Sequence, residues 1–98
     1  MEGRRTRTVI SAASVPSLAS HVRLQFDPVR GAWAVLSPER ILWPDEVGLD
    51  ILRMLDGRTP VGAISTALAA EYDAEAEEIA SDVAAFLQEW SDRLLVVA

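Results

Sequence analysis

The sequence contains no cysteine and no lysine, a single histidine, and no long apolar run. Without cysteine, disulfides, thiolate nucleophiles and cysteine-ligated zinc sites are excluded. No apolar run approaches the ~20 residues that a membrane-spanning helix needs. Residues 9–15 are also too short and too polar for the core of a signal peptide. These absences predict a cytoplasmic protein that has no membrane contact.

The charge is acidic and unevenly distributed. The net charge is −6, and residues 61–92 carry eight carboxylates but no arginine. A surface that binds nucleic acid must neutralise phosphates, so the C-terminal half argues against a nucleic-acid partner. The length of 98 residues suits one domain with a small core and leaves little material for a deep enzyme pocket.

The first part of the chain shows no sustained period of two or of 3.6 residues. It is rich in arginine, serine, alanine and threonine, a composition that does not bury a core. We therefore expect residues 1–15 to be a flexible tail or linker, and residues 16–98 to form the folded domain.

Three short segments have the pattern of strands. Polar and apolar residues alternate over 21–27, and aromatic and branched side chains dominate 32–36. A third strand over 41–43 ends at Pro44. Proline and glycine between the segments are typical of tight turns. The pattern predicts a three-stranded antiparallel meander.

The remainder has helical periodicity. We expect Asp45 to cap a first helix that ends at Asp56 and Gly57, Thr59 and Pro60 to open a second helix, and Asp73 to cap a third. The third helix has a continuous apolar seam made of Ile79, Val83, Phe86, Leu87 and Trp90. Residues 94–97 form an extended apolar end. Strands followed by helices predict an α+β domain, winged helix-turn-helix-like, whose helices cover one face of the sheet.

The side chains offer little for catalysis. His21 is the only histidine, so no second one completes a metal site. Glu75, Glu77 and Glu78 lie at the start of the third helix, where they complement the helix dipole and stay solvated. We expect no enzyme activity, no metal and no cofactor.

The third strand is the more informative feature. In a meander it lies at the edge of the sheet, and edges with free backbone groups are usually protected by lysine, proline or a bulge. Residues 41–43 have none of these. One interpretation is that these side chains fill the core while the 94–97 segment covers the edge. The other is an open edge that accepts an extended peptide by strand addition.

Two groups of residues carry a family resemblance. VRLQFD at 22–27 and WAVLSPE at 33–39 resemble the strand signature of the pyrroloquinoline quinone biosynthesis protein D family. DGRT at 56–59, with IL before it at 51–52 and Ile64 after it, resembles that family's first two helices, as DV at 82–83 and FL at 86–87 resemble its third. The likeness runs from about residue 16 to residue 97. Trp43-Pro44-Asp45 departs from the expected leucine–asparagine pair at the corner between strand and helix.

The resemblance implies a winged-helix-like peptide-recognition domain in a pathway that modifies a ribosomally made peptide. Such a protein is a non-catalytic chaperone that binds the precursor peptide of pyrroloquinoline quinone and presents it to a radical S-adenosylmethionine enzyme. That enzyme crosslinks a glutamate to a tyrosine. Some members are fused to another enzyme of the pathway, so residues 1–15 could be a cut linker.

The resemblance also implies where the peptide binds, between the third strand and the third helix. Carried over to this sequence, the two walls of the groove are Arg40, Ile41, Leu42 and Trp43 on one side, and Ile79, Asp82, Val83, Phe86 and Leu87 on the other. The sequence does not divide the helix residues between groove and core.

Other classes stay open at this point. A winged-helix DNA-binding domain shares the topology, but its recognition helix would be the acidic segment 74–91. A general protein-interaction module is equally compatible with the pattern. A small lyase or hydrolase needs convergent polar side chains, and the sequence has no candidate set.

Overall fold

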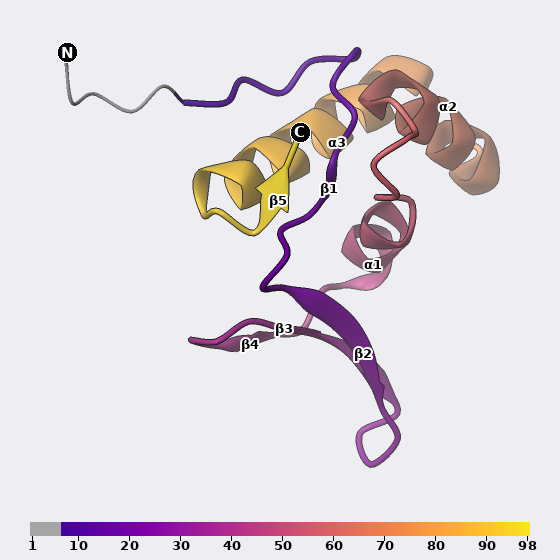
Figure 1. The fold of residues 1–98 in the computed structure, drawn as a ribbon. Coiled ribbons are helices and arrows are strands. Elements are labelled where there is room, and N and C mark those ends of the chain that lie inside the picture. Colours follow the sequence, from indigo (N-terminus) through magenta and orange to yellow (C-terminus); the bar gives the residue numbers. More distant parts are fainter. Residues whose placement is uncertain (1–6) are drawn as a thin grey trace, which may run out of the picture.

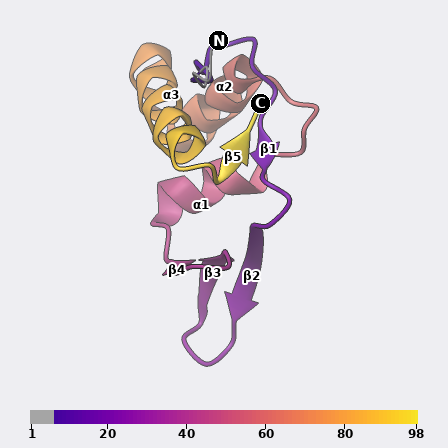
Figure 2. The ribbon, with the colours of Figure 1, turned by 60° about the vertical axis from the view of Figure 1, so that its left-hand side comes forward.

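The computed structural model describes residues 7–98, which form one α+β domain with three helices on one side of a small sheet (Figure 1). The elements in chain order are β1 (Ser17–Leu18), β2 (Arg23–Asp27), β3 (Ala32–Leu36), β4 (Ile41–Leu42), α1 (Glu46–Arg53), α2 (Val61–Tyr72), α3 (Ala76–Asp92) and β5 (Val96–Val97). Helix α1 lies between the sheet and the pair α2–α3, while the β2–β3 hairpin projects beyond the helices (Figure 2). No helix in this part of the chain is long and apolar enough to span a bilayer.

The sheet is the expected antiparallel meander with the order β2-β3-β4. Leu24 pairs with Val35, and Val35 pairs with Leu42, so these three side chains share the face toward the helices. Val35 is completely buried in the core. The turn before β3 needs Gly31, which has φ +65° and donates its N–H to the Asp27 carbonyl at 2.8 Å. The predicted fold class is confirmed.

Helix α1 begins as expected. The Asp45 carboxylate accepts the N–H of Gly48 at 2.7 Å, which satisfies one of the free donors of the first turn. The helix ends earlier than predicted, at Arg53, because the chain turns at Met54 before it reaches Gly57. Gly57 does adopt a positive φ of +72°, but its N–H donates to the Pro16 carbonyl at 3.1 Å. It therefore shapes a loop and does not terminate the helix.

The predicted caps of the other two helices were wrong. Thr59 does not cap α2, because its hydroxyl donates to the Asp56 carboxylate at 3.0 Å and Pro60 is the capping residue. The backbone N–H groups of Arg58 and Thr59 also bond to Asp56, and these bonds lower the pKa of its carboxyl. Asp73 ends α2 in a left-handed conformation (φ 50°, ψ 48°), while α3 begins at Ala76.

The three helices and the sheet enclose a single apolar cluster. Its most deeply buried members are Val35, Ile51, Ile64, Leu68, Val83 and Leu87. At the border of this cluster the Tyr72 hydroxyl donates to the Asp50 carboxylate and ties α2 to α1. That hydrogen bond is the main reason why the pKa of Tyr72 rises to about 12.

The segment before β1 lies along α3. Gln88 of α3 holds it through both atoms of its amide: Oε1 accepts the N–H of Ile10 at 2.9 Å, and Nε2 donates to the carbonyl of Thr8 at 2.8 Å. Arg7 donates from Nε and Nη2 to the two oxygens of Asp92, each at 2.8 Å. These bonds from the guanidinium lower the pKa of the Asp92 carboxyl.

The same segment also satisfies the N-terminus of α2, which has no side-chain cap. The carbonyls of Ser14 and Ala12 accept the N–H groups of Val61 and Gly62 at 2.8 and 2.9 Å. The sequence analysis expected a flexible tail or linker over 1–15 and gave no sign of these contacts, because hydrogen bonds made largely by backbone groups leave no apolar period in the sequence. Residues 1–6 lie outside the described residues, and the mobility of the segment and the domain boundary at residue 16 stay predictions.

Candidate functional site

The outer edge of β4 is the open side of the sheet. β4 is the last strand in the order β2-β3-β4, and within residues 7–98 no strand pairs with its other side. The segment that might have covered it, β5, pairs instead with β1 through Ser17↔Val97 and Leu18↔Val96. Of the two interpretations of the third strand, covering by the C-terminal segment was therefore wrong.

The register identifies which backbone groups face outward. The N–H of Ser37 donates to the carbonyl of Arg40 at 3.1 Å across a two-residue turn, and Leu42 pairs with Val35 two positions further along β4. Because hydrogen-bonded and non-hydrogen-bonded pairs alternate along an antiparallel ladder, Leu42 bonds inward to β3. The N–H and C=O of Ile41 point outward. They form a short template for another strand. Strand β4 is one residue shorter than predicted, since it ends at Leu42 and Trp43 follows it before Pro44.

The side chains of β4 divide between the two faces of the sheet. Leu42 packs against the core cluster on the helix side. Ile41 and Trp43, which are 57% and 43% exposed, line a hollow of about 370 Å³ on the opposite face, together with Ala34, Leu36 and residues of the β2–β3 hairpin. Arg30 from that hairpin covers the Trp43 ring, with 4.9 Å between its Cζ and the ring centroid. Of the four predicted strand residues, Leu42 therefore packs toward the helices and Arg40 lies near the end of α3, while Ile41 and Trp43 lie on the opposite face.

The predicted groove residues of helix α3 divide between the core and the surface. Val83 and Leu87 are 1% and 0% exposed and belong to the core. Ile79 and Phe86 are partly buried at the border of the core, and Asp82 is exposed. The accessible part of the predicted wall consists of Ile79, Asp82 and Phe86. The participation of Val83 and Leu87 in binding stays a prediction.

A close approach joins α3 to the start of α1. A Cβ added to Gly48 would lie 3.0 Å from Cε2 of Phe86, so the phenyl ring rests directly on that glycine backbone. Phe86 in turn stacks on Trp90, with 5.0 Å between ring centroids. A glycine inside a helix costs ~1 kcal/mol relative to alanine, and this cost was the sequence signal for a packing role at Gly48 that we missed.

The other end of the same groove is a polar hollow of about 270 Å³ lined by Ser37, Glu39, Arg40, Arg93 and Leu95. Arg40 comes from the turn before β4, and Arg93 follows the last residue of α3. Helix α3 and the residue after it therefore approach residues 40–48 at two points, Phe86 at Gly48 and Arg93 at Arg40. The groove between the strand edge and the helix stays a prediction. Of the residues at this end, the sequence analysis had assigned only Arg40 to the site.

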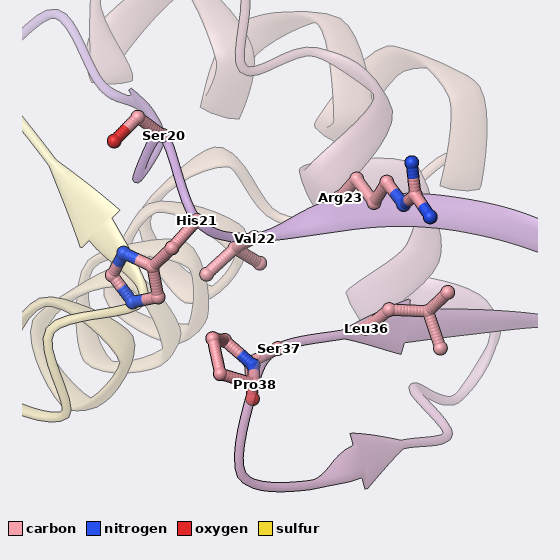
Figure 3. Close-up of a pocket in the computed structure, with 7 residues that line it drawn as sticks. All are labelled: Ser20, His21, Val22, Arg23, Leu36, Ser37 and Pro38. Atoms are coloured by element: carbon pink, nitrogen blue, oxygen red, sulfur yellow. The ribbon is translucent and has the colours of Figure 1, made fainter.

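A third hollow, of about 350 Å³, lies where β2 begins and the β3–β4 turn closes (Figure 3). His21 is its only imidazole, and Arg23, Ser20 and Ser37 are the other polar side chains around it. No carboxylate lines this hollow to orient the imidazole, as acid–base catalysis by histidine usually requires. Across residues 7–98 there is also no group of three histidine or carboxylate side chains arranged to hold a metal ion.

The fold and the open strand edge define a class of protein: a small winged-helix-like α+β domain with one unpaired edge strand, β4. The family model described as Coenzyme PQQ synthesis protein D (PqqD) matches residues 32–96. The chain belongs to this family.

Sequence relatives agree with the family assignment. A protein of Rhodopseudomonas palustris strain TIE-1 named PqqA binding protein is 46% identical over 87 residues, which cover 89% of this chain and 85% of the relative. A protein of the same name from Rhizobium meliloti is 44% identical over 88 residues, covering 90% of each chain.

Two solved structures are also similar. The solution structure of the PqqD truncation of Methylobacterium extorquens PqqCD is described as a stand-alone recognition element for ribosomally synthesized and post-translationally modified peptides. It superposes with a TM-score of 0.77 at 32% identity, covering 91% of this chain and 95% of that one. The crystal structure of PqqD from Xanthomonas campestris has a TM-score of 0.54 at 40% identity, covering 88% and 97%.

Proposed function

We propose that this protein binds the ribosomally made precursor peptide of pyrroloquinoline quinone, PqqA, by strand addition to the β4 edge. The observation that carries the proposal is the unpaired edge itself, and the accessible residues of α3, Ile79, Asp82 and Phe86, supply the second wall in this proposal. Backbone hydrogen bonds to Ile41 and Trp43 supply affinity, and contacts with Phe86 and its neighbours select the side chains of the peptide. The names of the relatives, which describe PqqA binding, support the choice of ligand.

The protein does no chemistry on the peptide in this proposal. It presents the bound precursor to a radical S-adenosylmethionine enzyme, which forms the crosslink between glutamate and tyrosine. In support, none of the three hollows combines a nucleophile, a base and an orienting group. A winged-helix DNA-binding function is disfavoured because α3, the helix in the recognition position, carries five carboxylates and no arginine.

The test combines binding and mass measurements on the full chain with synthetic precursor peptide. Calorimetry should show saturable binding, and the peptide mass should stay unchanged after incubation with this protein alone. Absence of binding would refute the proposed ligand, and a change of peptide mass without the partner enzyme would refute the non-catalytic role.

A further inference from the structure

The hollow at the turn end of the groove brings together two arginines from separate elements. Arg40 and Arg93 line it from opposite sides, with Glu39 as the one carboxylate in the lining. Arg93 has a loose ion pair with Glu89 of the preceding turn, 3.4 Å from Nη1 to Oε2, and Glu89 is 66% exposed. Such an exposed pair contributes little, so the Arg93 guanidinium is available to a better partner.

Two carboxylates without a nearby arginine in the sequence lie further from the turn, on α3 and at the start of α1. Asp82 lies one turn before Phe86 on the same side of α3, and Glu46 occupies the first turn of α1 beside the end of β4. Eleven residues separate Asp82 from Arg93, which corresponds to ~16 Å along a helix and to about five residues of an extended peptide. The two arginines and Asp82 are therefore separated by about the length of a short bound strand.

We propose that Arg40 and Arg93 form a carboxylate-binding pocket that takes an acidic group of the bound peptide and so fixes the direction and register of strand addition. The guanidinium group suits this role because its planar fork can donate two parallel hydrogen bonds to one carboxylate. Strand pairing alone fixes register weakly, since backbone groups repeat every second residue. The proposal rests on the proposed function, because the pocket lies at the end of the same groove.

Binding of synthetic precursor peptide to Arg40→Gln and Arg93→Gln variants, measured by calorimetry, tests the pocket. Arg58→Gln is the matched control, since Arg58 lies in the loop after α1 and lines none of the three hollows described above. We expect each pocket variant to weaken binding about five- to twentyfold, and the control variant to bind as the parent does. Circular dichroism verifies that each variant is folded.

A second arm identifies the acidic group. Peptides carry one Asp→Asn or Glu→Gln change at a time, or an amidated C-terminus, which separates a side-chain carboxylate from the terminal one. One of these peptides should bind the parent protein more weakly than the unchanged peptide does. The same peptide and the unchanged peptide should bind the Arg40→Gln variant equally well, because the acid and the arginine then contribute through one shared contact. Charge reversal tests the pocket through a gain of affinity. The Arg40→Glu variant should bind the peptide in which that acid is changed to lysine more tightly than it binds the unchanged peptide.

Each remaining outcome decides against the pocket. If both arginine variants bind within about twofold of the parent while Ile41→Pro binds at least about fivefold more weakly, strand addition stands and the carboxylate pocket is wrong. If every acid-to-amide peptide loses the same affinity for the parent protein, and none of these losses depends on Arg40 or Arg93, the peptide is held by general charge attraction and not by the pocket. If the parent protein does not bind the peptide at all, the proposed function fails and the pocket fails with it.

Discussion

Replacing Ile41 with proline should separate peptide binding from folding. The N–H of Ile41 faces the open edge, and its side chain is 57% exposed, so the fold loses neither a ladder bond nor much buried area. In the complex, the variant lacks the N–H that Ile41 donates to the peptide, and a peptide carbonyl is left without a hydrogen bond. The free energy of binding should therefore weaken by about 1–3 kcal/mol. Affinity should fall roughly 5- to 150-fold.

Leu42→Pro should give the opposite result. It removes an N–H that bonds inward to β3 and leaves the carbonyl of the buried Val35 without a partner, at ~1–3 kcal/mol. Lost packing of the partly buried leucine adds about 1–2 kcal/mol. Thermal unfolding followed by circular dichroism should therefore show a clear loss of stability for this variant alone.

Ile41→Ala is the control for the pair, because it removes the same side chain but keeps the N–H. It should bind closer to the parent than Ile41→Pro does. The reasoning fails if Ile41→Pro is folded and binds precursor peptide as tightly as Ile41→Ala, since the outward N–H would then contribute nothing.

Further predictions concern the helix wall, the tyrosine and the N-terminal segment. Phe86→Ala should weaken peptide binding by about 1–3 kcal/mol with a smaller loss of stability. Leu87→Ala removes a completely buried side chain and should lower the free energy of unfolding by roughly 2–5 kcal/mol. If both variants lose the same amounts of affinity and stability, the division of α3 between site and core is wrong. The single tyrosine should titrate near pH 12 by ultraviolet absorbance, and Asp50→Asn should return the pKa toward its ordinary value of ~10. Because the pKa of Tyr72 is raised on folding, its contribution to stability is complete below pH ~10 and is lost as the pH rises through about 12; an unshifted titration would contradict the hydrogen bond. Removing residues 1–15 should change peptide affinity by less than about threefold, since this segment contacts α2 and the Gln88 side of α3; a tenfold loss (~1.4 kcal/mol) would place it in the site.

The sequence predicted those elements whose pattern is strong and whose signals agree. Residues 32–36 were predicted as a strand to the residue, because branched and aromatic side chains and two flanking turns point the same way. The cap at Asp45 was correct for a similar reason, since one acidic residue follows proline directly before the helix. The fold class followed from these elements.

The errors arose where one polar residue had two possible partners. Thr59 and Asp73 both have good capping side chains, yet Thr59 bonds to Asp56 and Asp73 ends the preceding helix. The two-residue strand β1 has no detectable period, and the hydrogen bonds of residues 8–14 are made mostly by backbone atoms. Such features depend on tertiary placement and not on local pattern.

The site shows the same division. The location of the strand edge followed from the meander, and the two-residue turn 37–40 already contained the information that Leu42 bonds inward. The separation of Phe86 from Leu87 did not follow, because neighbouring residues on an apolar seam differ in burial only once the packing of α1 is known. Arg93 is distant in sequence from Arg40, and only the fold brings them to one hollow.

The central claim, that a peptide binds as an added strand at β4, is tested most directly by an amide chemical-shift titration of the labelled protein with the precursor peptide. The account predicts the largest changes at the outward amide of Ile41 and the neighbouring amide of Trp43, with a second group over residues 86–93 at the end of α3, and slowed hydrogen exchange at the Ile41 amide in the complex. Largest changes on α2 or on residues 8–14, with the amides of β4 unmoved and still exchanging as in the free protein, would contradict it.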